Sequence, residues 1–386
     1  MLDVALIGTG EPDAPGRDGF AMAYRHARAY ARLDECRLTA CADIVPENAR
    51  RFADEFGVPD EHVFEDYEAM LAAVEPDVVS VCVPPGVHAD IVVGCAESGH
   101  VRAVHCEKPM ADTWGDCRRM AEVCEREGVQ LTINHQLRFG RPFRRAKELL
   151  DAGAVGDLRR VEWSREHLFD AGTHAFDLSN YYVDAPVEWV LGNVDYREEN
   201  RWFGAHNENQ AVVQWRYENG VYGLAATGVG REFVGCYLRL VGSEGVLELH
   251  DDADLPTLRM RTDGGDWRAV DVGGAGVYRP QTGRLGVARK ALAARLPERL
   301  PGRESLRRLL VEPRYLDLAV EDVVDSLRED REPELHAGGA LAAEELIFAA
   351  WESSRRRGRI DLPLDIEDNP LAAMVEAGDL LVTPEP

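Results

Sequence analysis

The first 135 residues alternate between short apolar runs and longer amphipathic stretches. Apolar runs predict strands at residues 2–8, 36–43, 77–83, 101–107 and 129–135. The amphipathic stretches predict helices at 20–34, 47–58, 66–76, 88–98 and 112–127. The run DVVSVCV at 77–83 is nearly continuous, which is typical of a strand covered on both faces. Strands that alternate with helices in this way predict a parallel sheet with right-handed crossovers.

The pattern changes after about residue 150. We expect a strand at 159–166 and hairpins at 211–228, 236–250 and 257–272. The first of these hairpins has its turn at Asn219-Gly220, a pair that is a strong hairpin signal. Helical patterns return at 315–328 and 339–357, whereas the Gly- and Arg-rich stretch 273–312 fits no template. The sequence therefore predicts an α/β chain: a doubly wound parallel sheet, then an α+β domain with an open, largely antiparallel sheet.

The first strand leads into a glycine motif that breaks its expected spacing. Gly8 and Gly10 stand where a dinucleotide site needs them, but position 13 holds Asp13 instead of a third glycine. Counting back 20 residues from Asp43, at the end of the second strand, leads to Ala23, whose small side chain meets the same packing need. We therefore expect a dinucleotide loop with residues 11–19 inserted. Pyrophosphate would lie at the start of the following helix.

Asp43 bears on the choice of cofactor. A carboxylate at this position accepts hydrogen bonds from the ribose hydroxyls of NAD and repels the 2′-phosphate of NADP. The alternative is an ordinary carboxylate at a strand end that caps the next turn. We predict NAD, with NADP less favoured.

Lys108 is one of only three lysines, with Lys147 and Lys290. It follows the strand 101–107 at the carboxyl edge of the predicted sheet, where ligands bind in open parallel sheets. Pro109 biases Lys108 toward an extended backbone. The peptide bond between them is open to the cis form, although most X-Pro bonds are trans. The position of Lys108 marks it as a candidate for chemistry.

The stretch FDAGTHAFDLSNYY, residues 169–182, carries Asp170, His174 and Asp177. On a helix, Asp170 and His174 would share a face, and a carboxylate beside an imidazole fixes its tautomer and raises its basicity. The alternative makes Asp170 a helix cap and His174 a core residue. A metal is not predicted, because no third ligand has convincing spacing.

The composition of the chain limits the kinds of partner that it can bind. The net charge of −25 and pI of about 4.9 disfavour nucleic acid and anionic membranes. The acidic, lysine-poor character suggests a halophilic source, although a GC-rich genome would also favour arginine. The eight cysteines include no C-x-x-C pair, and we expect reduced, buried thiols in a cytoplasmic protein. The sequence shows no signal peptide and no apolar stretch long enough to span a membrane.

With these residues assembled, the chain resembles the Gfo/Idh/MocA family of NAD(P)-dependent oxidoreductases, which includes glucose–fructose oxidoreductase and inositol dehydrogenase. The resemblance covers nearly the whole chain. It is carried by Gly8-x-Gly10 with HARAY, ADIVPENARRFADEFGV (42–58), VPPGVHADI (83–91), Glu107-Lys108-Pro109, Asn134 with Arg138, Asp170-x-x-x-His174-x-x-Asp177, and the segment 331–363.

The resemblance implies a Rossmann domain at 1–135, a substrate and oligomerisation domain at 136–362, and an extended tail at 363–386. Lys108, Asp170 and His174 would be catalytic, with His174 as general acid/base. The implied cofactor contacts are Gly8, Gly10, Ala23, Asp43, Pro84, His88, Glu107 and Lys108. Weaker substrate candidates are Asn134, Arg138, Arg165, His167 and Asp177, the last also supporting His174. The open sheet would mediate a homodimer or homotetramer.

Three departures from the family pattern stand out: the insertion at 11–19, Pro85 where Asn or Ser is frequent, and a very short segment before Asp170. Arg165 and His167 are candidates to replace the missing pocket wall. We expect a dehydrogenase or reductase that moves a hydride between nicotinamide and a secondary alcohol or ketone of a sugar, polyol or cyclitol. The alternatives are a non-redox lyase, glycosidase or epimerase that oxidises transiently, and a silent NAD-sensing protein.

Overall fold

The computed structural model describes residues 1–11, 21–262, 264–278, 292, 295 and 313–380. The chain divides into two compact units: unit 1 comprises 1–136 and 316–341, and unit 2 comprises 137–315 and 342–386. We expected the segment 316–341 in the C-terminal domain, and the structure places it in unit 1 instead. It joins unit 1 because helix α10 (Tyr315–Glu329) buries Leu316, Val320 and Val324 in the same core as α1 and the first strands.

Unit 1 is built on a six-stranded parallel sheet, as predicted. Its strands are β1 (Leu2–Ile7), β2 (Cys36–Ala42), β3 (Val63–Phe64), β4 (Val78–Val81), β5 (Ala103–Cys106) and β6 (Gln130–Ile133). Their order is β3-β2-β1-β4-β5-β6, and every pair is parallel. The direction of winding reverses between β1 and β4, and a dinucleotide binds at such a switch point in doubly wound sheets.

The helices of unit 1 that precede residue 136 follow the predicted stretches closely. They are α1 (Met22–Tyr30), α2 (Pro46–Phe56), α3 (Tyr67–Val74), α4 (His88–Glu97) and α5 (Trp114–Glu127). Local chemistry fixes their ends: the Asp66 and Thr113 side chains cap α3 and α5, and Gly57 ends α2 in the left-handed region at φ 73°. Short 3₁₀ turns lie at Asp60–His62 and Pro85–Val87.

Unit 2 holds a nine-stranded mixed sheet in the order β16-β15-β14-β13-β7-β12-β11-β8-β17. Its strands are β7 (Leu158–Arg165), β8 (Val187–Asp195), β11 (Gln210–Tyr217), β12 (Tyr222–Thr227), β13 (Leu238–Gly242), β14 (Gly245–Leu249), β15 (Leu258–Thr262), β16 (Arg268–Ala269) and β17 (Ile360–Asp361). Only the pair β7–β12 is parallel. The three predicted hairpins and the α/β fold class are confirmed, and Gly220 turns the first hairpin at φ 87°.

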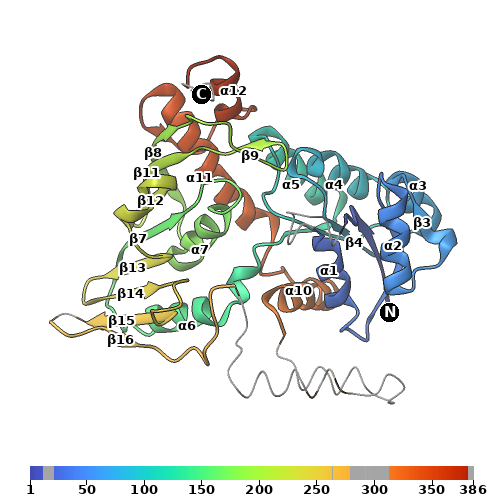
Figure 1. Ribbon diagram of the computed structural model, residues 1–386, viewed down its shortest axis with the longest axis horizontal. Coiled ribbons are helices and arrows are strands. Elements are labelled where there is room, and N and C mark those ends of the chain that lie inside the picture. Colours follow the sequence, from blue (N-terminus) through green and yellow to red (C-terminus); the bar gives the residue numbers. More distant parts are fainter. Residues whose placement is uncertain (12–20, 263, 279–291, 293–294, 296–312, 381–386) are drawn as a thin grey trace. The chain divides into compact units, whose positions relative to one another are not determined.

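Helices α7 (Thr173–Val183) and α11 (Ala337–Arg356) lie against one face of this sheet (Figure 1). The core beneath them is aromatic: the Phe176 ring packs 4.7 Å from Trp163 and 5.2 Å from Trp215. On the opposite face, Leu191, Val212 and Tyr222 are exposed. Unit 2 also contains α6 (Arg141–Asp151), the 3₁₀ turns Gln136–Phe139 and Gly228–Phe233, and a small hairpin of β9 (Arg201–Trp202) and β10 (Ala205–His206).

The segment from 363 onward is not simply extended, which corrects our expectation. It contains helix α12 (Pro370–Glu376), capped by Asn369, whose side chain accepts a hydrogen bond from the Ala372 amide. Leu371 and Met374 are buried. An asparagine cap followed by proline at the first helical position favours a helix strongly enough to override the acidic composition. Among the described helices, none has both the length and the apolar character that a membrane crossing requires.

Candidate active site

The switch point of unit 1 is shaped by a close approach of two strand ends. Gly8 follows β1 at φ 82°, and a Cβ placed there would lie 2.5 Å from Val83 Cγ1 and 2.9 Å from the Cys82 carbonyl oxygen. Only glycine satisfies both the left-handed backbone and the lack of space. Gly10 also lies in the left-handed region, at φ 66°. The backbone of the glycine loop is therefore accessible at the edge of the sheet, because neither glycine places a side chain there.

Asp43 holds this glycine loop in place. Its Oδ2 accepts hydrogen bonds from the Gly10 amide (2.8 Å) and the Thr9 hydroxyl (3.0 Å), and its Oδ1 accepts one from the Val45 amide (2.8 Å). The bond from Val45 is the cap of the next turn that we considered as an alternative role. A carboxylate offers about four acceptor positions, so one remains for a ribose hydroxyl. Beside it, the apolar Ile44 side chain is 89% exposed.

The helix after the loop begins without a side-chain cap. Ala21 is the N-cap of α1 and makes no capping hydrogen bond through its side chain. Ala23 is fully buried in the core, as a small residue at the third glycine position should be. The predicted insertion at 11–19 lies outside the described residues apart from Glu11. The uncapped start of α1 is suited to an anion.

A buried polar chain runs beneath the turn that carries Lys108. The Tyr30 hydroxyl lies 3.1 Å from Ser80 Oγ, which lies 3.1 Å from His26 Nδ1. His26 Nε2 lies 2.8 Å from Glu107 Oε1, and Asn134 Nδ2 donates to the same oxygen at 2.7 Å. Burial would raise the pKa of Glu107, but the hydrogen bonds from His26 and Asn134 and the charge of Lys108 outweigh it, lowering this pKa to about 2.

His88 supports two loops instead of pointing to a ligand. Its ring is fully buried, with Nε2 2.8 Å from the Val83 carbonyl oxygen and Nδ1 3.0 and 3.2 Å from those of Pro109 and Met110. Burial lowers the pKa of this imidazole. We expected a direct contact of His88 with the cofactor, and both ring nitrogens instead face backbone. The exposed Pro84 belongs to the loop that His88 holds.

Lys108 lies in the turn after β5, half-buried, and its peptide bond to Pro109 is cis. Five of the predicted segments each follow a different strand of the sheet of unit 1. They are the glycine loop, Asp43, Pro84, Glu107-Lys108 and Asn134. The carboxyl ends of parallel strands lie at one edge, so unit 1 presents these predicted residues together.

In unit 2, a tight turn connects β7 to α7. Asp170 lies in this turn and not on the helix, because α7 begins only at Thr173, after its N-cap Gly172. The predicted sharing of a helix face by Asp170 and His174 is therefore wrong, and Asp170 is not the cap either. His174 stands in the first turn of α7 and is 9% exposed.

Asp177, one turn further along α7, forms a buried two-point ion pair with Arg138. Arg138 Nε donates to Oδ2 at 2.8 Å, and a terminal guanidinium nitrogen donates to Oδ1 at 2.7 Å. We expected Asp177 to support His174 and Arg138 to meet substrate; the structure brings the two to each other. Arg138 belongs to the turn Gln136–Phe139, so the pair fastens α7 to the segment that follows β6.

Arg165, at the end of β7, lies among aromatic rings. Its guanidinium carbon is 4.6 Å from the centre of the Tyr237 ring and 5.6 Å from that of Tyr278. It also forms ion pairs with Glu166 (3.0 Å) and Asp251 (3.3 Å). His167 is half-buried and accepts a hydrogen bond from the Ala171 amide at 3.3 Å through Nδ1. His167 therefore bonds within the turn before α7, whereas Arg165 is held by two tyrosine rings and two carboxylates.

The polar segment 206–209 was not among the predicted site residues. His206 bonds to the Tyr196 hydroxyl at 2.6 Å, and Asn207 Oδ1 accepts from the Asp170 amide at 3.4 Å. Glu208 accepts from the Leu168 amide at 2.6 Å, and Asn209 accepts from the Arg197 amide at 2.7 Å. The sequence feature that points to this segment is the run HNEN, which stands directly before a strand whose alternate residues are buried.

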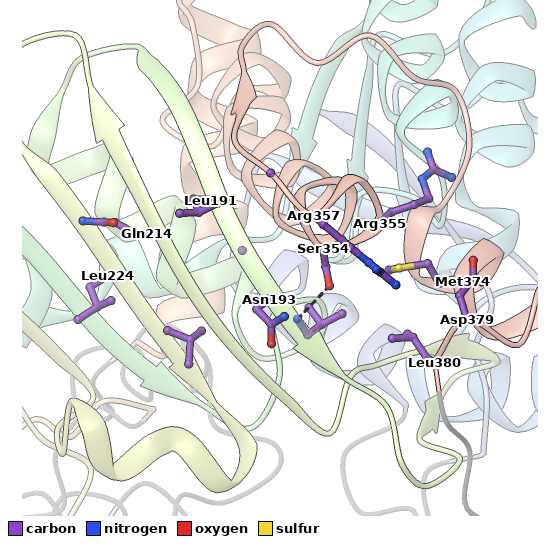
Figure 2. Close-up of a pocket in the computed structure, with 14 residues that line it drawn as sticks. Leu191, Asn193, Gln214, Leu224, Ser354, Arg355, Arg357, Met374, Asp379 and Leu380 are labelled. Carbon is purple, nitrogen blue, oxygen red and sulfur yellow. Dashed lines mark hydrogen bonds between the residues drawn. The ribbon is translucent and has the colours of Figure 1, made fainter.

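A separate pocket of about 1020 Å³ lies in unit 2. Figure 2 shows Leu191 and Gln214 from the sheet on one side, and Arg357, Met374 and Asp379 from the C-terminal segment on the other. The Val194 amide at its edge donates to Ser354 Oγ at 3.2 Å. Its lining includes none of the predicted cofactor or substrate residues. No cluster of metal-ligating side chains occurs among the residues that the structure describes.

Two family models match the chain. Residues 2–135 match the oxidoreductase family with an NAD-binding Rossmann fold, and residues 164–248 match the Gfo/Idh/MocA C-terminal domain. Myo-inositol 2-dehydrogenase of Thermotoga maritima is 26% identical over 214 residues, which cover 52% of this chain and 63% of that protein. D-glucoside 3-dehydrogenase of Escherichia coli is 32% identical over 207 residues, which cover 48% of this chain and 55% of that protein.

Solved structures share the fold at low identity. The aldose–aldose oxidoreductase of Caulobacter crescentus, complexed with glycerol, aligns with a TM-score of 0.70 at 19% identity, covering 94% of this chain and 99% of that one. The WlbA dehydrogenase of Bordetella pertussis, in complex with NADH and UDP-GlcNAcA, aligns at 0.66 and 21%, with the same coverage. The chain belongs to the Gfo/Idh/MocA family of oxidoreductases, and its N-terminal part is the NAD-binding Rossmann domain of that family.

Proposed function

We propose that this protein is an NAD-dependent dehydrogenase or reductase acting on a secondary alcohol or ketone of a sugar, polyol or cyclitol. The observation that carries the proposal is the edge of the sheet in unit 1. The glycine loop, Asp43, Glu107-Lys108 and Asn134 follow strands that end there, at the switch point of a doubly wound sheet. The relatives named above act on inositol and glucosides, which supports the substrate class.

The residues present fit NAD. Gly8 and Gly10 leave room for pyrophosphate, and the uncapped start of α1, where Ala23 packs, would hold it. Asp43 would accept a ribose hydroxyl with its remaining acceptor position, and the exposed Ile44 side chain would cover the adenine. NAD, when bound, supplies the acceptor for a hydride. A second phosphate on the ribose would be repelled by Asp43, so NADP fits less well.

Oxidation of an alcohol also requires that its proton leave. We assign this proton to His174, because an imidazole titrates near neutral pH and can act as acid or base. Lys108 would place a positive charge beside the alkoxide oxygen as it forms, which stabilises the transition state. Asp170 would accept hydrogen bonds from a neighbouring hydroxyl of the substrate. Lys108 belongs to unit 1 and His174 to unit 2.

We further propose a cytoplasmic homodimer or homotetramer. None of the eight cysteines forms a disulfide, and burial raises the pKa of several of their thiols, Cys41 and Cys124 to about 12. Such thiols are inert and suit a reducing compartment. The exposed apolar side chains Leu191, Val212 and Tyr222 on the open face of the sheet offer an interface. Light scattering of the purified chain tests this, and a monomer at working concentration would contradict it.

The test is a screen of myo-inositol, D-glucosides, aldoses, polyols and sugar acids with NAD and with NADP, at low and at high KCl concentration. We expect NADH absorbance to rise with at least one compound, and turnover to be faster with NAD than with NADP. Lys108→Ala should remove turnover while NAD still binds. Lys147→Ala is the matched lysine control and should stay active, because Lys147 is also half-buried but pairs with Asp151 on α6.

The outcomes separate the alternatives. A product that forms without net change in NADH would identify a non-redox enzyme that oxidises transiently. Tight NAD binding without any turnover across the screen would identify an NAD-sensing protein. Full activity of Lys108→Ala would refute the assigned mechanism even if the dehydrogenase activity were found.

A further inference from the structure

The turn between β7 and α7 is held by side chains from elsewhere in unit 2 and not by regular structure. The Leu168 amide donates to Glu208 Oε1 at 2.6 Å, and the Asp170 amide donates to Asn207 Oδ1 at 3.4 Å. Leu168, Asn207 and Glu208 are each fully buried. The backbone on both sides of Phe169 thus depends on two neighbouring side chains of one segment.

Glu208 connects this turn to two further elements. The Thr227 hydroxyl, at the end of β12, donates to Oε1 at 3.0 Å, and the indole Nε1 of Trp351 on α11 donates to Oε2 at 3.2 Å. Trp351 in turn packs against Phe169 of the turn, with ring centres 5.6 Å apart. One buried carboxylate therefore ties the turn to the sheet and to the helix that covers it.

A carboxyl group suits the chemistry of these partners. All three groups that face Glu208 from other elements are donors, and an ionised carboxylate is a pure acceptor. Glutamine has the same shape, but its amide nitrogen would oppose one of these donors. Burial raises the pKa of Glu208 to about 7, against the lowering influence of the hydrogen bonds from Leu168, Thr227 and Trp351. Retaining an ionisable group here is costly, and such groups concentrate at functional sites.

Any movement of the turn would reach the predicted active-site residues. Asp170 lies two residues after Leu168, and His174 is in the first turn of α7. The turn is tightly packed, because a Cβ at Gly172, the N-cap of α7, would overlap the Leu168 carbonyl oxygen. A shift of Leu168 must therefore displace Gly172 and the start of the helix.

We propose that Glu208 is a positioning residue, whose buried carboxylate fixes the turn 166–172 and thereby the placement of Asp170 and His174. The inference rests on the proposed function for its catalytic consequence, since it takes Asp170 and His174 as the groups that meet substrate. Its structural half, that Glu208 holds the turn, stands on the hydrogen bonds alone.

The experiment compares Glu208→Gln with Thr227→Val, Trp351→Phe and a matched control, Glu162→Gln. Glu162 is also a buried glutamate of this sheet, but it pairs with Arg239 on the opposite face. Hydrogen exchange is measured for the amides of 166–176, and kcat, KM and the pH profile are measured with the substrate that the screen identifies. NAD affinity serves as the reference, because the cofactor belongs to unit 1.

We expect Glu208→Gln to lower kcat by roughly ten- to hundredfold and change its pH profile, with NAD affinity unchanged. Exchange at Leu168 and Asp170 should quicken, and the two single-donor variants should show smaller effects of the same kind. If Glu208→Gln fails to fold, those two variants carry the test. A kcat and pH profile equal to those of Glu162→Gln would overturn the catalytic half.

Unchanged exchange in the turn would overturn the whole inference. If the wild-type chain turns over no compound, the proposed function fails by itself, and the exchange measurement still decides whether Glu208 holds the turn.

Discussion

Arg138 and Asp177 meet through two parallel hydrogen bonds of 2.8 and 2.7 Å, in an ion pair that is almost fully buried. Fork-to-fork pairing of this kind is stronger and more directional than a single contact. The Arg138 guanidinium also lies 5.4 Å from the centre of the Tyr181 ring. The pair therefore fixes the face of α7 that carries Asp177, one turn from His174.

Breaking this pair should destabilise unit 2. Asp177→Ala breaks the buried ion pair by removing its carboxylate, which costs about 3–5 kcal/mol of unfolding free energy. Arg145→Ala is the matched control, because its ion pair with Glu148 on α6 is exposed and should contribute about 0–1 kcal/mol. Denaturant unfolding of both variants measures the difference. Equal losses would show that the buried pair does not hold α7.

The glycine loop provides a second comparison, between Gly8→Ala and Gly57→Ala. Both glycines have positive φ, 82° and 73°, so each alanine meets the left-handed penalty of about 1–2 kcal/mol. Only at Gly8 would the new Cβ also meet other atoms, since nothing lies within 4 Å of it at Gly57. We expect Gly8→Ala alone to lose NAD binding in calorimetry. Equal NAD affinity in the two variants would contradict the placement of the cofactor.

Asp43→Asn tests the dual role of this carboxylate. Both of its oxygens accept from backbone amides, so an amide nitrogen in either position removes one acceptor and opposes a donor. Leaving a buried donor unsatisfied costs about 1–3 kcal/mol, and a loss of about 1.4 kcal/mol in binding is tenfold in affinity. We expect NAD affinity to fall by about tenfold, and the ratio of NAD to NADP affinity to shrink. A variant that keeps the wild-type ratio would remove Asp43 from cofactor selection.

The charge of the chain leads to a prediction about salt. A net charge of −25 opposes the compact state, and the Debye length falls from about 10 Å at 0.1 M to about 3 Å at 1 M. The melting temperature should therefore rise with KCl over this range, and should change less with an uncharged osmolyte. A melting temperature that is independent of KCl would contradict the expected halophilic character.

Sequence patterns predicted most of unit 1 because a parallel sheet leaves a strong signal. Its strands are buried on both faces and read as apolar runs, and its helices are amphipathic. Strand β8 was missed for the opposite reason: it carries Trp189 and Leu191 toward the open face, which erases the alternation between apolar and polar positions. Helix α6 was missed as well, in a stretch dominated by arginines.

The candidate site was predictable where chemistry is local in sequence. Gly8 and Asp43 end predicted strands and Lys108 follows one, and the carboxyl edge of the sheet brings the three together. The partner of Asp177 was not predictable, because Arg138 is 39 residues away and the pairing depends on tertiary packing. Glu208 was missed because a polar run beside a hairpin looks like a solvated loop. Its burial is set by Thr227 and Trp351, which lie 19 and 143 residues away.

The raised pKa of Glu208 makes a prediction about stability that needs no substrate. The carboxyl titrates near 4.5 when unfolded and near 7 when folded, so the native state binds its proton more tightly. The stabilisation is fully present below about 4.5 and is lost as the pH rises to about 7. At about 1.4 kcal/mol per pH unit, this group removes up to about 3 kcal/mol across that window.

Glu208→Gln carries no titrating group, so its unfolding free energy relative to wild type should rise through the same window and level off above it. The titratable side chains nearest in sequence to its three partners are His167 and Asp170 in the turn, Arg231 after β12, and Glu352 on α11, with His206 on its own segment. None of them contributes to the shift, which burial dominates. Unfolding of both proteins at several pH values checks the prediction, and a difference that stays constant from pH 4.5 to 7 would show that Glu208 is ionised throughout.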